Sequence, residues 1–361
     1  MPEALKHAYN QKYLQQVADE ISRHHKGFDK AGFLALVFDG EWQERELKAR
    51  MSHIRSCLHE VLSLPFTEAV PVLCNAAPTF GGFEAMFFPD YIEAYGQDQW
   101  DISLPALEWL TRFSSSEFAV RPFIIADQER MMEQMYQWAE DDNYHVRRLA
   151  SEGCRPRLPW AQALPEFKQS PLPVLPALEK LKTDESDYVR RSVANNLNDI
   201  AKDNAQVTID WAKANKGNSD YTDWIIKHGC RTLLKQADRQ VLQLFGYGDT
   251  ESFDIKNLKL VKELIRIGEH LEFSFQLTSS SEELGKLRLE YEIGYLKANG
   301  KHSYKVFKIC EGEYKEKDKT FYRRQSFKPM TTRKHHPGLH WLKIKVNGVE
   351  KQSLSFMLRE G

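Results

Sequence analysis

The spacing of apolar residues changes once along this chain, near residue 250, and this change constrains the fold more than any other feature. In the first part, apolar residues recur every three or four positions, which is the period of amphipathic helices. Within residues 41–62, one such face consists of Leu47, Met51, Ile54, Leu58 and Val61. In the second part, apolar and polar residues alternate, as in half-buried strands, through LEFSFQL, KLRLEYEIGYL, YKVFKI, TFYRRQSF, HWLKIKV and QSLSFML. The sequence therefore predicts a mainly α protein that ends in a smaller all-β domain.

Turn signals support the β part. Asn-Gly pairs at 299–300 and 347–348 flank alternating runs and predict hairpin turns. Several short strands within about 110 residues are typical of a compact immunoglobulin-like sandwich. We expect a helical domain over residues 1–250, the sandwich over residues 254–361, and a linker formed by YGDTESFD (247–254).

A repeated motif indicates how the helices are arranged. Val146-Arg147-Arg148 follows DDNYH, and Val189-Arg190-Arg191 follows DESDY 43 residues later. Weaker copies run through SSSEFAVRPFI (114–124) and SDYTDWIIKHGCRTLL (219–234). A period near forty with an acidic helix start is typical of HEAT-like helix pairs, which stack into an α-solenoid.

The repeats also place acids and bases together. A first set, spaced by four and three residues, shares one face if its helix continues far enough: Arg148, Glu152 and Arg155. The matching set in the next repeat is Arg191, Asn195 and Asn198 or Asp199. If the two helices are neighbours, arginines, amides and carboxylates converge on one groove.

Arginines in a groove can hold phosphates by charge-assisted hydrogen bonds, but carboxylates there weaken phosphate binding. Carboxylates are useful where positive charge develops on the ligand. Cleavage of an N-glycosidic bond is such a reaction, because the sugar passes through an oxocarbenium-like state that a carboxylate stabilises. The same carboxylate can position or deprotonate the attacking water. Trp160, in RLPW, can pack against the sugar or a cationic base.

Each of these residues also has a purely structural explanation, and the sequence leaves both open. Glu152 can bridge to an arginine one turn away on a solvated helix, and Asp199 can be a polar residue near a helix end. Glu117 can interact with the macrodipole from a first helical turn, and Trp160 can anchor its loop on the core. The Arg pairs at 147/148 and 190/191 can be repeat ladders, in which equivalent arginines make structural contacts in successive HEAT repeats.

Charge is distributed unevenly along the chain. Residues 253–361 contain 22 Lys and Arg against 14 Asp and Glu, an excess of eight positive charges, whereas the whole chain has a net charge of −1. This asymmetry suggests that the C-terminal part approaches a polyanion. The basic residues that we expect to contact it are Lys305, Lys308, Arg323, Arg324, Arg333 and Lys334.

Several kinds of site lack support in the sequence. The five cysteines are scattered and form no C-x-x-C pair, which argues against a zinc site or disulfide framework and fits a reducing cytoplasm. His335-His336 is a weak metal signal that a basic loop explains better. Phosphate-binding loops and dinucleotide fingerprints are lacking, and no apolar run approaches the length that spans a bilayer. We therefore expect no metal, no cofactor and no membrane association.

Three long motifs resemble those of one family. LTRFSSSEFAVRPFI (110–124), YHVRRLASEGCRPRLPWA (144–161) and YVRRSVANNLNDIAKDN (188–204) are similar to the AlkC group of bacterial DNA alkylation repair proteins, relatives of AlkD among HEAT-like repeat DNA glycosylases. The similarity covers roughly residues 1–250, and the C-terminal part looks like the immunoglobulin-like extension of a subset of that group.

The resemblance implies a monofunctional enzyme that excises 3-methyladenine, 3-methylcytosine and 1-methyladenine from double-stranded DNA. It implies that the protein bends the duplex and reaches the sugar without flipping the base into a pocket. The catalytic candidates that it carries onto this chain are Glu117, Glu152, Asp199 and Trp160. The candidates for DNA contact are Arg148, Arg155, Arg157, Arg190 and Arg191, with Asn195 on the same face. A groove that binds one duplex needs only a monomer.

An alternative is a non-catalytic HEAT-repeat scaffold that binds damaged DNA or a protein partner, since a fold alone does not settle function. The three acids in the expected basic groove argue against this alternative, because a pure binder has no use for them.

Overall fold

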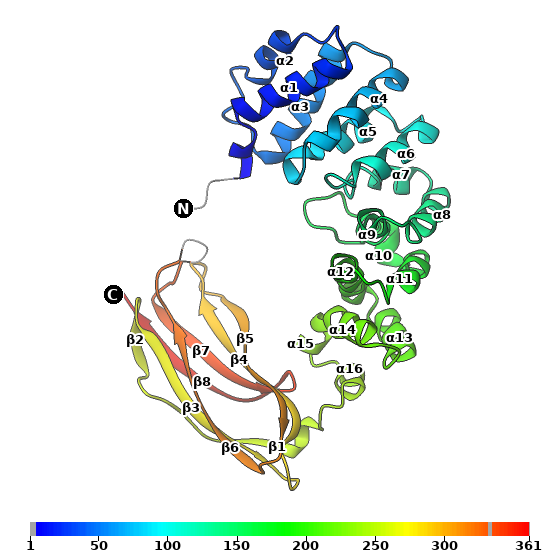
Figure 1. The fold of residues 1–361 in the computed structure, drawn as a ribbon. Coiled ribbons are helices and arrows are strands. Elements are labelled where there is room, and N and C mark those ends of the chain that lie inside the picture. The colour runs from blue at the N-terminus through cyan, green and yellow to red at the C-terminus, as the bar shows by residue number, and fades with distance from the viewer. Residues whose placement is uncertain (1–4, 331–333, 361) are drawn as a thin grey trace. The chain divides into compact units, whose positions relative to one another are not determined.

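The computed structural model describes residues 5–330 and 334–360, and within them the chain forms helices first and strands second (Figure 1). The chain divides into two compact units, Met1–Gly229 and Cys230–Gly361. The prediction of a mainly α protein with a C-terminal β-sandwich is confirmed.

The helices of the first unit are α1 (Gln11–His24), α2 (Lys30–Val37), α3 (Leu47–Leu62), α4 (Phe66–Ala76), α5 (Phe87–Tyr95), α6 (Trp100–Leu110), α7 (Arg121–Ala126), α8 (Gln128–Trp138), α9 (Tyr144–Glu152), α10 (Pro165–Gln169), α11 (Leu175–Leu181), α12 (Asp187–Asp203), α13 (Ala205–Asn215) and α14 (Asp220–Gly229). Short 3-10 turns are η1 (Leu5–Ala8), η2 (Ala77–Thr79), η3 (Phe83–Met86) and η4 (Leu172–Val174).

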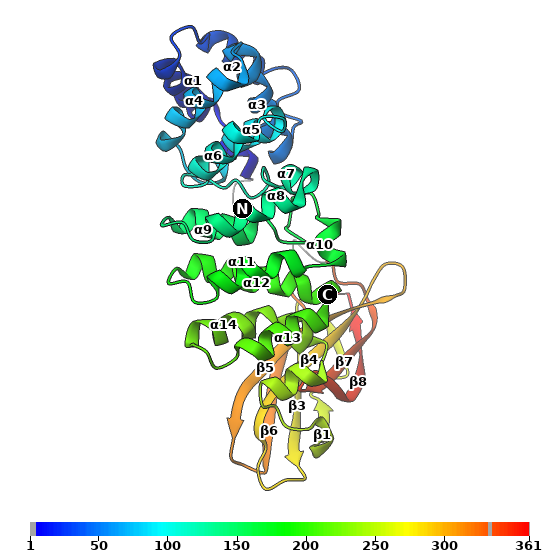
Figure 2. The ribbon, with the colours of Figure 1, turned by 90° about the vertical axis from the view of Figure 1, so that its right-hand side faces the viewer.

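Helix pairs form successive tiers in the second half of this unit. The pairs α8/α9, α11/α12 and α13/α14 follow one another, with α9, α12 and α14 in one layer and α8, α11 and α13 in the other (Figures 1 and 2). The predicted HEAT-like stacking is therefore present. Helix α12 shows why it forms: Val189, Val193 and Leu197 recur every four residues on its buried face.

The acidic stretches that precede the repeated motif act as helix starts. The Asn143 side chain in DDNYH accepts a hydrogen bond from the His145 amide at 2.9 Å, and caps α9. In DESDY, Asp184 Oδ1 accepts one from the Ser186 amide at 2.8 Å, just before α12. Both stretches satisfy amide groups that the first turn of a helix leaves unpaired.

Helix α5 carries a half-buried acid, Glu93, whose charge opposes folding. Burial, and the neighbouring Asp90, raise the pKa of Glu93 to about 7 from an ordinary value of 4.5, with Lys48 and Arg55 offsetting part of the shift. At pH values between these two pKa values, the folded state therefore holds a proton that the unfolded state has lost. The free energy of unfolding falls as pH rises through this window.

We predict that Glu93→Gln removes this part of the pH dependence. The variant should be more stable than the wild type at pH 8, and the two should converge at pH 5, because the wild-type side chain is then protonated and also neutral. Urea unfolding at several pH values measures this. Glu129→Gln, which changes an exposed acid of α8, is the control. Parallel profiles for Glu93→Gln and the wild type would contradict the prediction.

The second unit begins with the short helices α15 (Arg231–Lys235), α16 (Arg239–Leu244) and η5 (Thr250–Ser252). Its strands are β1 (Phe253–Leu260), β2 (Leu264–Arg266), β3 (His270–Ser279), β4 (Gly285–Leu296), β5 (His302–Tyr314), β6 (Asp318–Ser326), β7 (Gly338–Val346) and β8 (Val349–Arg359). Secondary structure thus changes from helix to strand around the expected linker, although α15 and α16 belong to the same compact unit as the strands.

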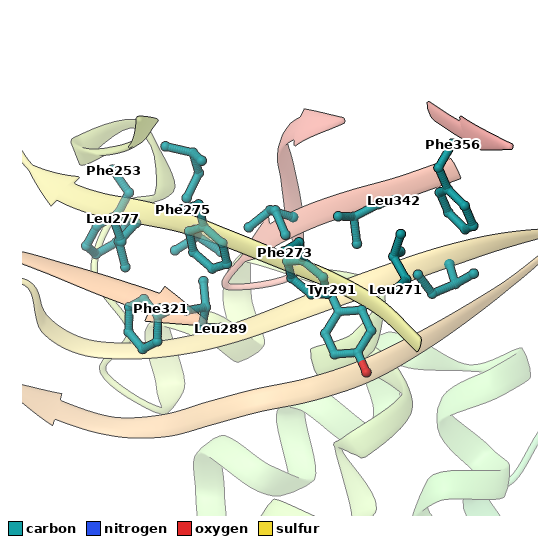
Figure 3. Close-up of a cluster of buried hydrophobic side chains, with 14 of the residues drawn as sticks. Phe253, Leu271, Phe273, Phe275, Leu277, Leu289, Tyr291, Phe321, Leu342 and Phe356 are labelled. Carbon is teal, nitrogen blue, oxygen red and sulfur yellow. The ribbon is translucent and has the colours of Figure 1, made fainter. Parts of the chain in front are cut away.

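The strands form two sheets, ordered β1-β3-β6 and β2-β8-β7-β4-β5. Their pairings are antiparallel except for β2 with β8. Side chains from both sheets pack into one core, where Phe273 of β3 meets Tyr291 of β4 in an edge-on ring contact (Figure 3). The alternation of buried and half-buried residues along β3 matches the predicted pattern.

Both Asn-Gly pairs join antiparallel neighbours, as predicted. Asn347 and Gly348 connect β7 to β8 with φ values of 50° and 81°, which is the left-handed backbone of a tight hairpin turn. Gly300, with φ of 75°, lies between β4 and β5. Over the described ranges, no single helix is long and apolar enough to cross a membrane, and one bent pair (47–62 with 66–79) passes only by length and composition.

Candidate active site

Helix α9 ends at Glu152, so the helical face expected to run on to Arg155 is interrupted. Gly153 is the C-cap residue of the helix, and Pro156 lies three residues after it. Arg155 nevertheless turns back, and its Nη1 donates to Glu152 Oε1 at 2.6 Å. The two side chains meet through the turn after the helix and not through helical spacing.

Arg155 also joins the neighbouring repeat. Its Nε and Nη2 lie 2.9 and 2.8 Å from Oδ2 of Asp199, on α12. The other oxygen of Asp199 accepts from Lys202 at 2.9 Å. The side chains of Arg155, Glu152 and Asp199 are 9, 7 and 2% exposed, so this is a buried ion-pair cluster.

Arg148 extends the cluster in the other direction. It forms an ion pair with Glu117 and a longer one, at 3.4 Å, with Glu152. Glu117 lies in the turn four residues before α7 and not in a first helical turn. Ser115 links the two, since its hydroxyl donates to Glu117 Oε2 at 2.8 Å and accepts from Arg148 at 2.9 Å.

Acids and bases therefore alternate along one line, which we call the ion chain: Glu117, Arg148, Glu152, Arg155, Asp199 and Lys202. Burial alone would lower the pKa of Arg155, but Glu152 and Asp199 outweigh it and the pKa is raised above its ordinary value. The pKa of Arg148 is raised likewise against burial, by Glu152 and Glu117. Each arginine is held charged by the acids on either side.

The polar face of α12 differs by one residue from the predicted one. The Arg191 side chain is 67% exposed and pairs with Asp187 one turn earlier, at 2.6 Å. Asn195 is half-buried on the same helix. The stripe that reaches the acids is Ser192, Asn196 and Asp199, spaced by four and three residues. Arg191 lies about 80° from Asp199 around the helix, whereas Ser192 lies within about 20°.

Ser192 makes a contact that the spacing argument does not predict. Its hydroxyl donates to Glu152 Oε2 at 2.6 Å, while Asn196 Nδ2 donates to the Ser151 carbonyl at 2.7 Å. The signal in the sequence is the unusual run of polar residues on the apolar side of α12. Arg155 and Ser192 thus donate to the two carboxylate oxygens of Glu152. In Glu117, by contrast, Oε1 accepts no hydrogen bond within the described chain.

Two arginines predicted to contact DNA are engaged within the protein. Arg157 donates two hydrogen bonds of 2.6 Å to Asp203 and is 40% exposed. Arg190 donates to the Asp184 and Glu185 carbonyls at 2.7 Å and lies 4.0 Å over the Tyr221 ring. These contacts match the repeat-ladder explanation for Arg190.

Trp160 is exposed and not packed on the core. Its side chain is 67% exposed, and its φ of 65° places the backbone in the left-handed region, which is rare for tryptophan. Lys48 of α3 donates to the Trp160 carbonyl at 2.7 Å. The loop therefore presents this indole to solvent.

Of the basic residues predicted in the sandwich, Lys305 and Lys308 lie on β5, Arg323 and Arg324 lie on β6, and Lys334 lies four residues before β7. Lys305, Lys308 and Arg324 are exposed, as is Lys334. Arg323 of β6 is half-buried and donates to the Ile309 carbonyl of β5 at 3.1 Å, a contact between strands of different sheets. Arg333 lies outside the described residues. Within the described ranges, groups of three or more potential metal ligands are absent.

Comparisons with known proteins agree on one family. Residues 106–233 match the family model "DNA alkylation repair enzyme", and residues 254–360 match "Uncharacterised protein YhaZ, C-terminal Ig-like domain". The chain is 46% identical to the uncharacterized protein YhaZ of Bacillus subtilis, over 98% of this chain and 99% of that protein.

A solved structure gives the same result. The Pseudomonas fluorescens alkylpurine DNA glycosylase AlkC, bound to DNA containing an abasic site analogue, matches with a TM-score of 0.93 and 38% identity. The match covers 99% of this chain and 100% of that one. With the helical tiers and the immunoglobulin-like sandwich, these similarities show that this chain belongs to the AlkC family of DNA alkylation repair proteins.

Proposed function

We propose that this protein is a monofunctional DNA glycosylase that removes cationic alkylated bases from duplex DNA by hydrolysing the N-glycosidic bond. The expected substrates are 3-methyladenine, 3-methylcytosine and 1-methyladenine. The observation that carries the proposal is the ion chain, in which three carboxylates from three repeats are held in one cluster. The AlkC relative with 38% identity was solved bound to DNA containing an abasic site analogue, which supports DNA as the partner.

The chemistry of such a substrate suits this arrangement. An adenine or cytosine alkylated on a ring nitrogen, as in these three substrates, already carries positive charge, so it leaves without protonation by the enzyme. What remains is to stabilise the positive charge on the sugar and to place a water. Glu152 and Asp199 supply fixed negative charge at low exposure, where electrostatic stabilisation is strongest. The unpaired oxygen of Glu117 is the proposed acceptor for the attacking water.

Reaction without base flipping follows from the same chemistry. Because the enzyme needs no group on the leaving base, it can act on the sugar from the groove side, and the usual reason to extrude the base is absent. Trp160 is exposed and can pack against the deoxyribose. One protein chain suffices for one duplex, so we propose a monomer.

Release of free methylated base from methylated duplex DNA tests the proposal. The wild type should release 3-methyladenine and leave an abasic site with an uncut strand. Absence of release would leave the scaffold alternative, a protein that binds damaged DNA without acting on it. Strand cleavage at the site would show a lyase step and contradict the monofunctional assignment.

We propose that the helical part, residues 1–250, is the catalytic domain. The sandwich, residues 254–361, is proposed to make a second set of contacts with the DNA backbone. We predict that replacing Lys305, Arg324 and Lys334 together by Gln weakens duplex binding. The salt dependence of log K should become shallower by about 0.9 for each phosphate that the variant no longer neutralises. Titration of a fluorescent duplex at several salt concentrations measures this slope.

The control for this triple variant has the same change in charge at another position. It replaces Lys256, Lys259 and Lys262, which are exposed on or next to β1, by Gln. We expect the control to keep the wild-type slope. If the Lys305/Arg324/Lys334 variant also keeps the wild-type affinity and slope, the sandwich is a structural or partner-binding module.

A further inference from the structure

One arginine of the repeated motif makes different contacts from its counterparts. The motif Val-Arg occurs at 120–121, 146–147 and 189–190. In the second copy, Arg147 Nη1 donates to the Asp141 and Asp142 carbonyls at 3.0 and 2.9 Å. Arg190 makes the equivalent pair of contacts with the two carbonyls five and six residues before it. In both copies the arginine braces the loop just before its own helix.

Arg147 also forms an ion pair with Asp184 of the next repeat, at 2.6 Å. Arg121 differs because its hydrogen bonds in the described chain all go to backbone carbonyls of the next tier. Its Nη1 donates to the Gly153 and Arg155 carbonyls, both at 2.9 Å, and its Nε donates to the Gln162 carbonyl. The residue is 0% exposed. The guanidinium therefore ties together the two ends of residues 153–162, which we call the site loop.

The site loop carries the groups on which the proposed reaction depends. It starts directly after Glu152, and it contains Arg155, which joins Glu152 to Asp199, and the exposed Trp160. A hydrogen bond to the Arg155 carbonyl fixes the backbone from which that guanidinium projects. A hydrogen bond to the Gln162 carbonyl fixes the loop two residues after Trp160.

Close packing shows that this contact is built into the fold. A Cβ added at Gly153 would lie 2.6 Å from Val120 Cγ2 and 3.1 Å from Met135 Cε. Only glycine therefore allows the end of α9 to approach Val120 and Arg121 closely enough for the hydrogen bond to its carbonyl. Stability alone does not account for a buried arginine, since Nη2 of Arg121 makes no hydrogen bond within the described chain.

We propose that Arg121 is a positioning residue that holds the site loop in its active shape, a role that rests on the proposed glycosylase function. It touches neither the sugar nor the base. It acts through the backbone of Arg155 and through the loop that presents Trp160.

The test compares full-length wild type with Arg121→Lys, which keeps the charge but loses the planar fork that reaches three carbonyls. We expect the single-turnover rate of base release to fall by about ten- to a hundredfold. The dissociation constant for methylated duplex should stay within about threefold, since no DNA-contacting group is removed. Without DNA, amide hydrogen exchange should become faster within residues 153–162.

Arg147→Lys is the matched control, because Arg147 has the equivalent place in the next repeat and also donates to two loop carbonyls, while its remaining partner, Asp184, lies outside the site loop. It should change neither the rate nor exchange in residues 153–162. If Arg121→Lys does not fold, Gly153→Ala takes its place, since it inserts a methyl group between α9 and Val120. This variant should also release base more slowly while its dissociation constant for DNA stays the same, and exchange in the site loop should become faster.

The outcomes separate the two proposals. A wild type without base release defeats the glycosylase proposal, while the exchange measurement still shows whether Arg121 holds the loop. The positioning role is overturned if the wild type releases base and Arg121→Lys keeps the wild-type rate and the wild-type exchange in the site loop. Where the lysine variant is unfolded, the same result for Gly153→Ala overturns it. A slower rate with weaker DNA binding in proportion would also overturn it.

Discussion

Replacing Glu152 by Gln is expected to slow release of 3-methyladenine by about a hundred- to a thousandfold, which corresponds to a few kcal/mol of lost stabilisation. The amide keeps the shape of the side chain and its hydrogen bond from Ser192, but it removes the negative charge proposed to face the sugar. Single-turnover measurement of released base gives the rate directly, free of slow product release.

A matched control exists in the same unit. Glu108 also forms an ion pair with an arginine four residues away, at 3.2 Å, as Glu152 does with Arg148 at 3.4 Å, but it lies outside the ion chain. Glu108→Gln should keep the wild-type rate. Asp199→Asn should slow the reaction like Glu152→Gln. If both site variants keep the wild-type rate, the assignment of these acids as catalytic is wrong.

Replacing Arg155 by Met is expected to destabilise the protein by about 3–5 kcal/mol, because removing one partner of a buried ion pair leaves an uncompensated charge. Here two carboxylates lose their shared partner, and their side chains are only 7 and 2% exposed. Urea unfolding followed by circular dichroism measures the change in the free energy of unfolding.

The control for Arg155→Met is Arg191→Met, at a side chain that is 67% exposed and paired with a half-exposed acid. It should change stability by less than about 1 kcal/mol, since surface ion pairs contribute little. A small effect of Arg155→Met would mean that Glu152 and Asp199 find other partners, and that Arg155 does not hold the ion chain together.

Much of the site was predictable because its residues follow repeat spacing. The offset of 43 residues placed Glu152 and Asp199 on neighbouring helices, and the structure brings them to the same arginine. The glutamate within the basic motif has a physical explanation as well: it neutralises Arg148 and Arg155, which share it. Several arginines interpreted as phosphate contacts are therefore largely occupied with carboxylates or carbonyls.

The remaining features depend on tertiary structure that spacing does not encode. Arg155 meets Glu152 through a turn after the helix ends. On α12, the polar face that contacts Glu152 begins at Ser192 and not at Arg191, a shift of one residue around the helix. Arg121 has the same local motif as Arg147, yet it donates only to backbone carbonyls 32 to 41 residues ahead, whereas Arg147 also donates to the loop before its own helix. Only the packing of α7 against the end of α9 reveals this difference.

In the sandwich, the strands with clean alternation were predictable and the irregular ones were not. Strand β1 was not predicted because its register shifts between Lys256 and Lys259, around Asn257 with φ of 55°, which interrupts the alternation in the middle of the strand. Strand β2 has three residues, too few to show a period.

A structure of the full chain on a duplex that contains a positively charged sugar analogue would show which residues face the sugar. We predict that at least one carboxylate of Glu117, Glu152 and Asp199 lies within about 4–6 Å of the cationic centre, where opposite charges interact strongly. Trp160 should contact the same sugar. A complex in which the cationic sugar lies away from all three acids, or is faced by other residues, would contradict it.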